Sequence, residues 1–94
     1  MKTTTADRMN NVAAALAAHL DLPCMAAGSV PFDGGVSLTF DCATAGHATV
    51  VAAALRMLLA RDVDAFEIDG VWSVSGTVDA ATVARLAARV ARAA

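Results

Sequence analysis

Two segments of the chain repeat one pattern: a glycine turn, a strand with apolar residues at even-numbered positions, and an alanine-rich helix. The first strand covers residues 35–42 and leads into a helix over residues 44–60. The second covers residues 70–78 and leads into a helix that runs from residue 79 to the end. Alternation with a period of two is typical of a strand with one buried face. Because a turn precedes each strand, we interpret each as the second arm of a hairpin.

A third helix is predicted before the first hairpin. Between residues 4 and 20, large apolar residues recur three or four positions apart, at Met9, Val12, Leu16 and Leu20. This spacing produces one apolar stripe along a helix. Pro23 disfavours helical backbone at the residue before it, so we expect the helix to end at residues 21–22.

The first arm of the first hairpin is expected over residues 24–32, at an edge of the sheet. Its small residues have low strand propensity, and Pro31 has no backbone N–H to donate. An edge strand tolerates such a residue because one of its sides has no neighbour. The turn falls at residues 33–35, and the next strand places Val36, Leu38, Phe40 and Cys42 on the core face.

The register of the second hairpin decides which aromatic side chains enter the core. Its turn falls at Asp69 and Gly70. A two-residue turn would place Phe66 opposite Ser73, on the face away from Trp72, because directly opposed residues share a face. A three-residue loop with Gly70 in the left-handed conformation pairs even positions with even positions. We expect the three-residue loop, because it brings both Phe66 and Trp72 into the core.

The odd-numbered strand positions are nearly all polar, which predicts that one face of the sheet is exposed to water. These positions are Ser37, Thr39, Asp41, Glu67, Ser73, Ser75 and Thr77. The expected fold is an α+β two-layer sandwich. It has a four-stranded, mainly antiparallel sheet with three helices on one face, in the order α-β-β-α-β-β-α. Residues 1–94 are expected to form a single domain, because no linker is apparent.

This order of elements, together with an isoelectric point of about 5.4, resembles that of the small dimeric chaperones of bacterial type III secretion. The resemblance covers most of the chain and rests on element order, with one strand fewer and no shared motif residues. It implies a protein partner and a homodimer. A bacterial or mobile-element origin is also expected, since 24 alanines and a single lysine are typical of a GC-rich genome.

Charge and hydropathy indicate which classes of partner and which cellular location to expect. The net charge is -2, with seven basic and nine acidic residues, which makes nucleic acid an unlikely main partner. The longest apolar stretch, residues 48–60, contains Arg56 and is too short to cross a bilayer. Asp7 and His19 make the N-terminal segment a poor signal peptide. We therefore expect a cytoplasmic protein that does not bind membranes.

The last helix offers the best candidate for a partner-binding surface. Asp79 can cap its first turn, and its larger apolar residues are spaced to face inward. Arg85, Arg89 and Arg92 form a stripe on the opposite side. Guanidinium groups at this spacing can bind phosphates or an acidic protein surface. The alternative is that the stripe is only the solvated face of an amphipathic helix.

Two cysteines and two histidines suggest a second kind of site. Four residues separate His19 from Cys24, and four separate Cys42 from His47. Two thiolates and two imidazoles can bind zinc, but this spacing differs from common zinc motifs, and buried free cysteines are the simpler interpretation. Two further interpretations are a Cys24–Cys42 disulfide and a Cys42 thiolate activated by His47. We expect no metal and no cofactor.

The sequence contains no phosphate-binding loop, no dinucleotide fingerprint and none of the common hydrolase motifs. We therefore expect a small non-enzymatic protein-binding module, such as an adaptor, a secretion-chaperone-like protein or an inhibitor. Its candidate partner-binding residues are Arg85, Arg89 and Arg92. Two alternatives stay open: a nucleic-acid-binding regulator that uses the same arginine helix, and a small metal or redox protein that uses the cysteines and histidines.

Overall fold

The structure is a computed structural model that describes residues 13–14, 16–58 and 60–93, without the side chains of residues 87 and 90–93. A first helix includes residues 13–14 and 16–19; its predicted beginning, with Met9 and Val12, lies outside the described residues. The other elements are β1 (Ala26–Phe32), β2 (Gly35–Cys42), α2 (Ala45–Met57), β3 (Arg61–Ile68), β4 (Val71–Asp79) and α3 (Ala80–Ala93). This order confirms the predicted α+β fold class.

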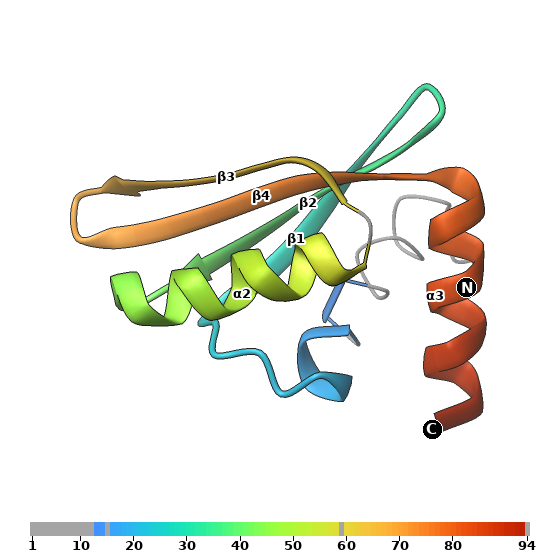
Figure 1. The fold of residues 1–94 in the computed structure, drawn as a ribbon, viewed down its shortest axis with the longest axis horizontal. Helices are drawn as coiled ribbons and strands as arrows, with labels where there is room; N and C mark the ends of the chain where they lie inside the picture. The colour runs from blue at the N-terminus through green and yellow to red at the C-terminus, as the bar shows by residue number, and fades with distance from the viewer. Residues whose placement is uncertain (1–12, 15, 59, 94) are drawn as a thin grey trace, which may run out of the picture.

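The four strands form one antiparallel sheet in the order β1-β2-β4-β3. The connection from β2 to β3 therefore passes β4, and α2 carries it along one face of the sheet (Figure 1). The first helix lies on the same side, and α3 descends on that side from the end of β4 (Figure 1). The other face of the sheet has no described helix on it, and we call it the outer face.

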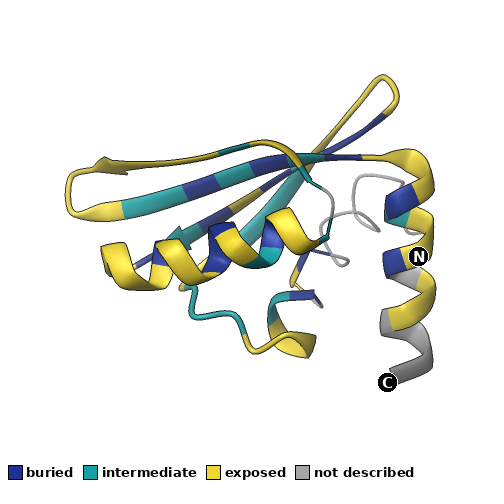
Figure 2. Ribbon diagram, viewed as in Figure 1, coloured by how far each residue is buried: buried dark blue, intermediate teal, exposed yellow. Residues whose placement is uncertain are grey.

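The core forms where β2 and β4 meet α2. Val36, Leu38, Phe40 and Cys42 of β2 are at most 1% exposed, as the alternation predicted. Val74 and Val78 of β4, and Val51 and Leu55 of α2, belong to the same cluster. The buried residues alternate with partly exposed ones along both central strands, as Figure 2 shows. The predicted parity is thus confirmed for β2 and β4.

The cap predicted at Thr44 places the start of α2, but the helix ends at Met57 and not at residue 60 as predicted. Thr44 is in extended conformation before α2, and its hydroxyl oxygen accepts a hydrogen bond from the backbone N–H of His47 at 3.1 Å. Such a cap satisfies one of the N–H groups that the first turn leaves without a partner. β1 lies at an edge of the sheet, where Pro31 is tolerated.

The second hairpin differs from the prediction. Ile68 pairs with Val71, and Phe66 pairs with Ser73, so the turn has two residues and not three. Asp69 and Gly70 have φ angles of 51° and 82°. Positive φ at both central residues matches the right-handed twist of the two strands, and aspartate followed by glycine is a preferred sequence for this turn. The turn geometry therefore fixes the register, and the predicted three-residue loop is wrong.

This register moves Phe66 out of the core. Phe66, Ile68 and Val71 lie on the outer face and are 44%, 59% and 36% exposed. Glu67, which the odd-position rule assigned to the outer face, lies opposite Trp72 on the side of α2. The expectation that Phe66 meets Trp72 in a common interior is wrong. The observed pairing therefore follows the preference of the turn and not the burial of Phe66.

The outer face is therefore polar at its centre and apolar at two corners. Ser37, Thr39, Ser73, Ser75 and Thr77 lie on the two central strands, as predicted. Val30 and Phe32 of β1 form a second exposed apolar corner, at the end opposite the Asp69 turn.

A β-bulge at the start of β3 changes which residues face the core. Two residues, Asp62 and Val63, stand opposite the single residue Gly76 of β4. Asp62 has φ 54° and is the extra residue. Val63 then points to the core, where it packs above Gly76 together with Leu55. The bulge lets the first part of β3 contribute to the core although its second part does not.

Candidate functional site

Asp79 fixes the start of α3 and therefore the direction of the arginine helix. Its Oδ1 accepts a hydrogen bond from the backbone N–H of Thr82 at 2.7 Å. This hydrogen bond, with a further one from the Thr82 side chain and the nearby charges of Arg85 and Arg61, lowers the pKa of the Asp79 carboxyl. A carboxylate at this end also interacts favourably with the helix dipole.

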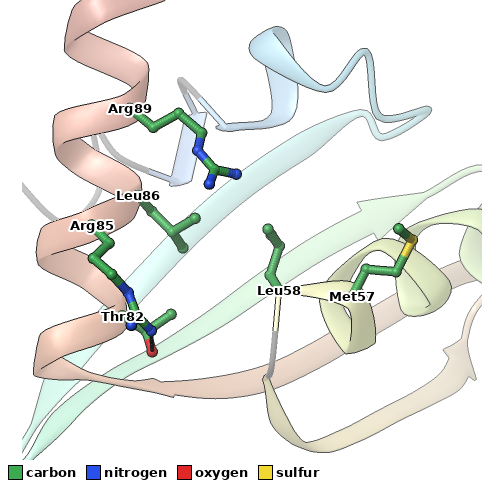
Figure 3. Close-up of a pocket in the computed structure, with 6 residues that line it drawn as sticks. All are labelled: Met57, Leu58, Thr82, Arg85, Leu86 and Arg89. Carbon is green, nitrogen blue, oxygen red and sulfur yellow. Dashed lines mark hydrogen bonds between the residues drawn. The ribbon is translucent and has the colours of Figure 1, made fainter.

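A cleft of about 310 Å³ lies between the C-terminal end of α2 and the first turns of α3. Figure 3 shows the side chains that line it: Met57, Leu58, Thr82, Arg85, Leu86 and Arg89. Two helices meet here end to side, because α3 leaves the sheet at the end of β4 while α2 runs along its face (Figure 1). The volume is at the lower end of the range of small-molecule pockets.

The base of the cleft is mostly apolar and its rim is exposed. On α3, Thr82 and Leu86 are each 6% exposed. On the other side, Leu58 follows the end of α2, and its side chain lines the cleft (Figure 3). Its backbone N–H donates hydrogen bonds to the carbonyls of Ala54 and Leu55. Met57 is 84% exposed, so a methionine side chain lies almost free at the rim. Flexible thioether side chains of this kind adapt to differently shaped apolar ligands.

Two predicted residues supply the charge of the cleft. Arg85 and Arg89 are one helical turn apart on α3 and both line the cleft; Arg89 extends away from α3, and Arg85 runs along it toward Thr82 (Figure 3). Arg85 donates a hydrogen bond to the Thr82 hydroxyl at 3.2 Å. In the part of the chain that the structure describes, no carboxylate lines the cleft, although Arg85 lies close enough to Asp79 for its charge to lower the pKa of that carboxyl. Both cations can therefore bind an external carboxylate.

The arginine stripe was expected on the side of the helix opposite its apolar residues. Instead, Arg85 and Arg89 lie next to Leu86 and face α2. The third predicted residue, Arg92, belongs to α3, but its side chain lies outside the described residues. The structure thus brings two of the three arginines to one cleft.

A second hollow, of about 260 Å³, lies near the turn of the first hairpin, between it and the start of β3. It is lined by Phe32, Gly34, Arg61, Asp62, Thr77, Val78 and Asp79. Its one guanidinium, from Arg61, lies close enough to Asp79 to lower the pKa of that carboxyl. This hollow thus holds one guanidinium beside the carboxylates of Asp62 and Asp79, whereas two guanidiniums and, among the described residues, no carboxylate line the α2–α3 cleft. For this reason we take the α2–α3 cleft as the candidate site.

The cysteines and histidines do not form a metal site in this fold. His19 and His47 are exposed, and nowhere among the residues that the structure describes do three His, Cys, Asp or Glu side chains come together as metal ligands. Cys24 and Cys42 are both free thiols. Burial raises the pKa of each, and the carboxylate of Asp41 adds to the effect. Protonated thiols are poor nucleophiles and poor metal ligands.

Hydrogen-bond donors and apolar side chains line the α2–α3 cleft. Guanidinium groups donate hydrogen bonds and stay protonated, so Arg85 and Arg89 can hold an anionic group. The sequence pattern assigned only the arginines to a site and missed Met57 and Leu58. Both residues follow Leu55, the last buried residue of α2, and only the direction of α3 brings them to the cleft.

No protein family, no curated protein and no solved structure matches this chain. None of the helices described in the structure is long and apolar enough to cross a membrane.

Proposed function

We propose that this chain is a small, non-enzymatic protein-binding module of the adaptor, inhibitor or secretion-chaperone type. Its binding site is the α2–α3 cleft, and its partner supplies a segment that combines a carboxylate with a large apolar side chain. The observation that carries the proposal is the position of Arg85 and Arg89, which line one cleft beside an apolar base with no carboxylate among the described residues of the lining. Two cations next to apolar surface favour a ligand with both properties.

Each part of the ligand has a defined counterpart in the cleft. A carboxylate can accept two parallel hydrogen bonds from one guanidinium, which fixes its orientation as well as its charge. An apolar side chain can then lie between Leu58 and Leu86, with Met57 closing over it from the rim. Aromatic and aliphatic anchors in such pockets dominate the energetics of many protein interfaces.

The proposal is tested with fluorescein-labelled peptides in which glutamates flank a leucine. A matched peptide has glutamine in place of each glutamate. We expect saturable binding of the glutamate peptide in fluorescence anisotropy. The double variant Arg85→Glu and Arg89→Glu should bind at least about tenfold more weakly, since charge-assisted hydrogen bonds contribute about 1.5–3 kcal/mol each. Arg56→Glu, which changes an exposed arginine outside the cleft lining, is the matched control and should bind normally.

Two results would overturn this function. One is a double variant that is folded and binds the glutamate peptide as tightly as the unaltered chain. The other is a short DNA or RNA duplex that binds more tightly than the peptide at low salt and loses affinity in the double variant. Phosphate contacts would show that steep salt dependence, and the nucleic-acid-binding alternative would then replace the proposal.

A further inference from the structure

β3 is an edge strand, and on one side, which we call the open side, no described strand pairs with it. The sheet order places β4 along its other side, and the only described elements that pack closely against it are β4 and α2. Seven of its eight residues are exposed, and Figure 2 shows this strand in yellow over most of its length. An open edge carries backbone N–H and C=O groups that can pair with another strand.

The register shows which residues of β3 offer these groups. In a hairpin with a two-residue turn, Ile68 exchanges hydrogen bonds with the residue after the turn, and the direction of the backbone groups alternates from there. The groups of Ala65 and Glu67 therefore point to the open side. One hydrogen bond supports this independently: the N–H of Ala65 donates to Oδ1 of Asp64 at 2.9 Å and not to β4.

The open edge is acidic and partly apolar. Asp62, Asp64, Glu67 and Asp69 lie along β3 and its turn, against the single cation of Arg61. Phe66 and Ile68 are exposed beside these carboxylates on the outer face. A strand that carries cations and apolar side chains would match both features. We propose that β3 accepts an extended basic segment of a partner protein as a fifth strand of the sheet.

A second copy of this chain fits the edge less well. Two acidic β3 strands paired with each other would bring like charges together across the new ladder, which is destabilising. The opposite edge, β1, has no charged residue, and Pro31 has no N–H to offer there. Charge complementarity therefore favours a basic partner, and favours β3 over β1.

Asp64 controls access to this edge. Its carboxylate holds the Ala65 N–H until an incoming carbonyl oxygen replaces it. Edge strands in native proteins are often protected by charged side chains of this kind. Removing the Asp64 side chain should therefore expose a donor, whereas removing Glu67 removes an equal charge without exposing one.

The proposed edge site is independent of the α2–α3 cleft, and its test distinguishes binding at the edge from binding in the cleft. The probe is a fluorescein-labelled peptide in which lysine alternates with valine; a second copy of the probe is methylated at every backbone N–H. We expect saturable anisotropy with the first probe and none with the methylated one. Ala65→Pro removes the outward N–H without removing a donor to β4, and should weaken binding about tenfold, because at least one backbone hydrogen bond is lost. The Arg85→Glu and Arg89→Glu variant should bind the lysine peptide normally.

A second comparison keeps the test valid if Ala65→Pro fails to fold. Asp64→Ala should bind the lysine peptide more tightly than Glu67→Ala, although both lose one negative charge. Equal affinity of these two variants would overturn the proposal, as would binding that survives methylation of the peptide backbone. Self-association of the chain that Ala65→Pro abolishes would also overturn it, because the occupant of the edge would then be a second copy.

Discussion

Glu67 lies directly opposite Trp72 across the β3–β4 pair, on the side of the sheet that α2 covers. The pairing leaves Trp72 only partly buried and places the two neighbours of Glu67, Phe66 and Ile68, on the outer face. The register that this pair defines thus determines which side chains in the second half of β3 lie on the outer face. It also produces the mixed acidic and apolar edge on which the fifth-strand proposal rests.

The two phenylalanines Phe66 and Phe40 should respond very differently to substitution. Phe40 is 0% exposed, so Phe40→Ala should lower the free energy of unfolding by about 3–5 kcal/mol through lost burial and a cavity. Phe66→Ala should change it by less than about 1 kcal/mol, because exposed side chains away from the core contribute little. Urea denaturation followed by circular dichroism measures both. Equal losses would contradict the register of the second hairpin.

The turn of the second hairpin requires a residue that accepts positive φ. Gly70→Val should destabilise the chain by about 1–3 kcal/mol, since a β-branched residue is strained in the left-handed region. Gly28→Val is the matched control, because no other atom lies within 4 Å of an added Cβ there. The comparison uses melting temperatures at one pH. If the Gly70→Val variant had the same melting temperature as the unaltered chain, the result would contradict the two-residue turn.

Low pH should lower the stability of the folded chain, partly through protonation of Asp79. The pKa of this carboxyl is lowered in the folded chain from an ordinary value of 3.8, so its stabilising effect is complete above that value. The effect is lost as the pH falls from 3.8 through the lower folded-state pKa. Asp79→Asn keeps a capping oxygen but removes the titration. Its melting temperature should therefore fall less steeply below pH 3.8 than that of the unaltered chain; parallel curves would refute this.

The two thiols should react slowly with an alkylating agent. Their raised pKa leaves a smaller thiolate fraction at neutral pH than a free cysteine has. Cys42 is fully buried while Cys24 is half-buried, so Cys24 should be modified first. Mass spectrometry after timed exposure to iodoacetamide measures both rates, with urea-unfolded chain as the reference. Rapid alkylation of Cys42 in the folded chain would contradict this prediction, because it would show that the reagent reaches the buried thiol.

The sequence was sufficient for the central strands and the helix caps. Alternation in β2 is unambiguous because Leu38 and Phe40 are large, and the caps at Thr44 and Asp79 depend only on residues a turn away. The second hairpin was not predictable from burial alone. There the preference of Asp69 and Gly70 for a two-residue turn outweighs the gain from burying Phe66.

The candidate site was predictable only in part. Arg85 and Arg89 could be selected from their helical spacing. Their meeting with Met57 could not, because it depends on the direction in which α3 leaves the sheet and on where α2 ends. Such long-range placement leaves no periodic signal in the sequence.

The extra residue at Asp62 gives the two halves of one strand different roles in packing. Directly after it, Val63 packs against the core. Farther along, the side chains are exposed, so the interior places few demands on them. Substitutions in this second half would therefore change what the edge offers to a partner while the packing of the interior stays as it is.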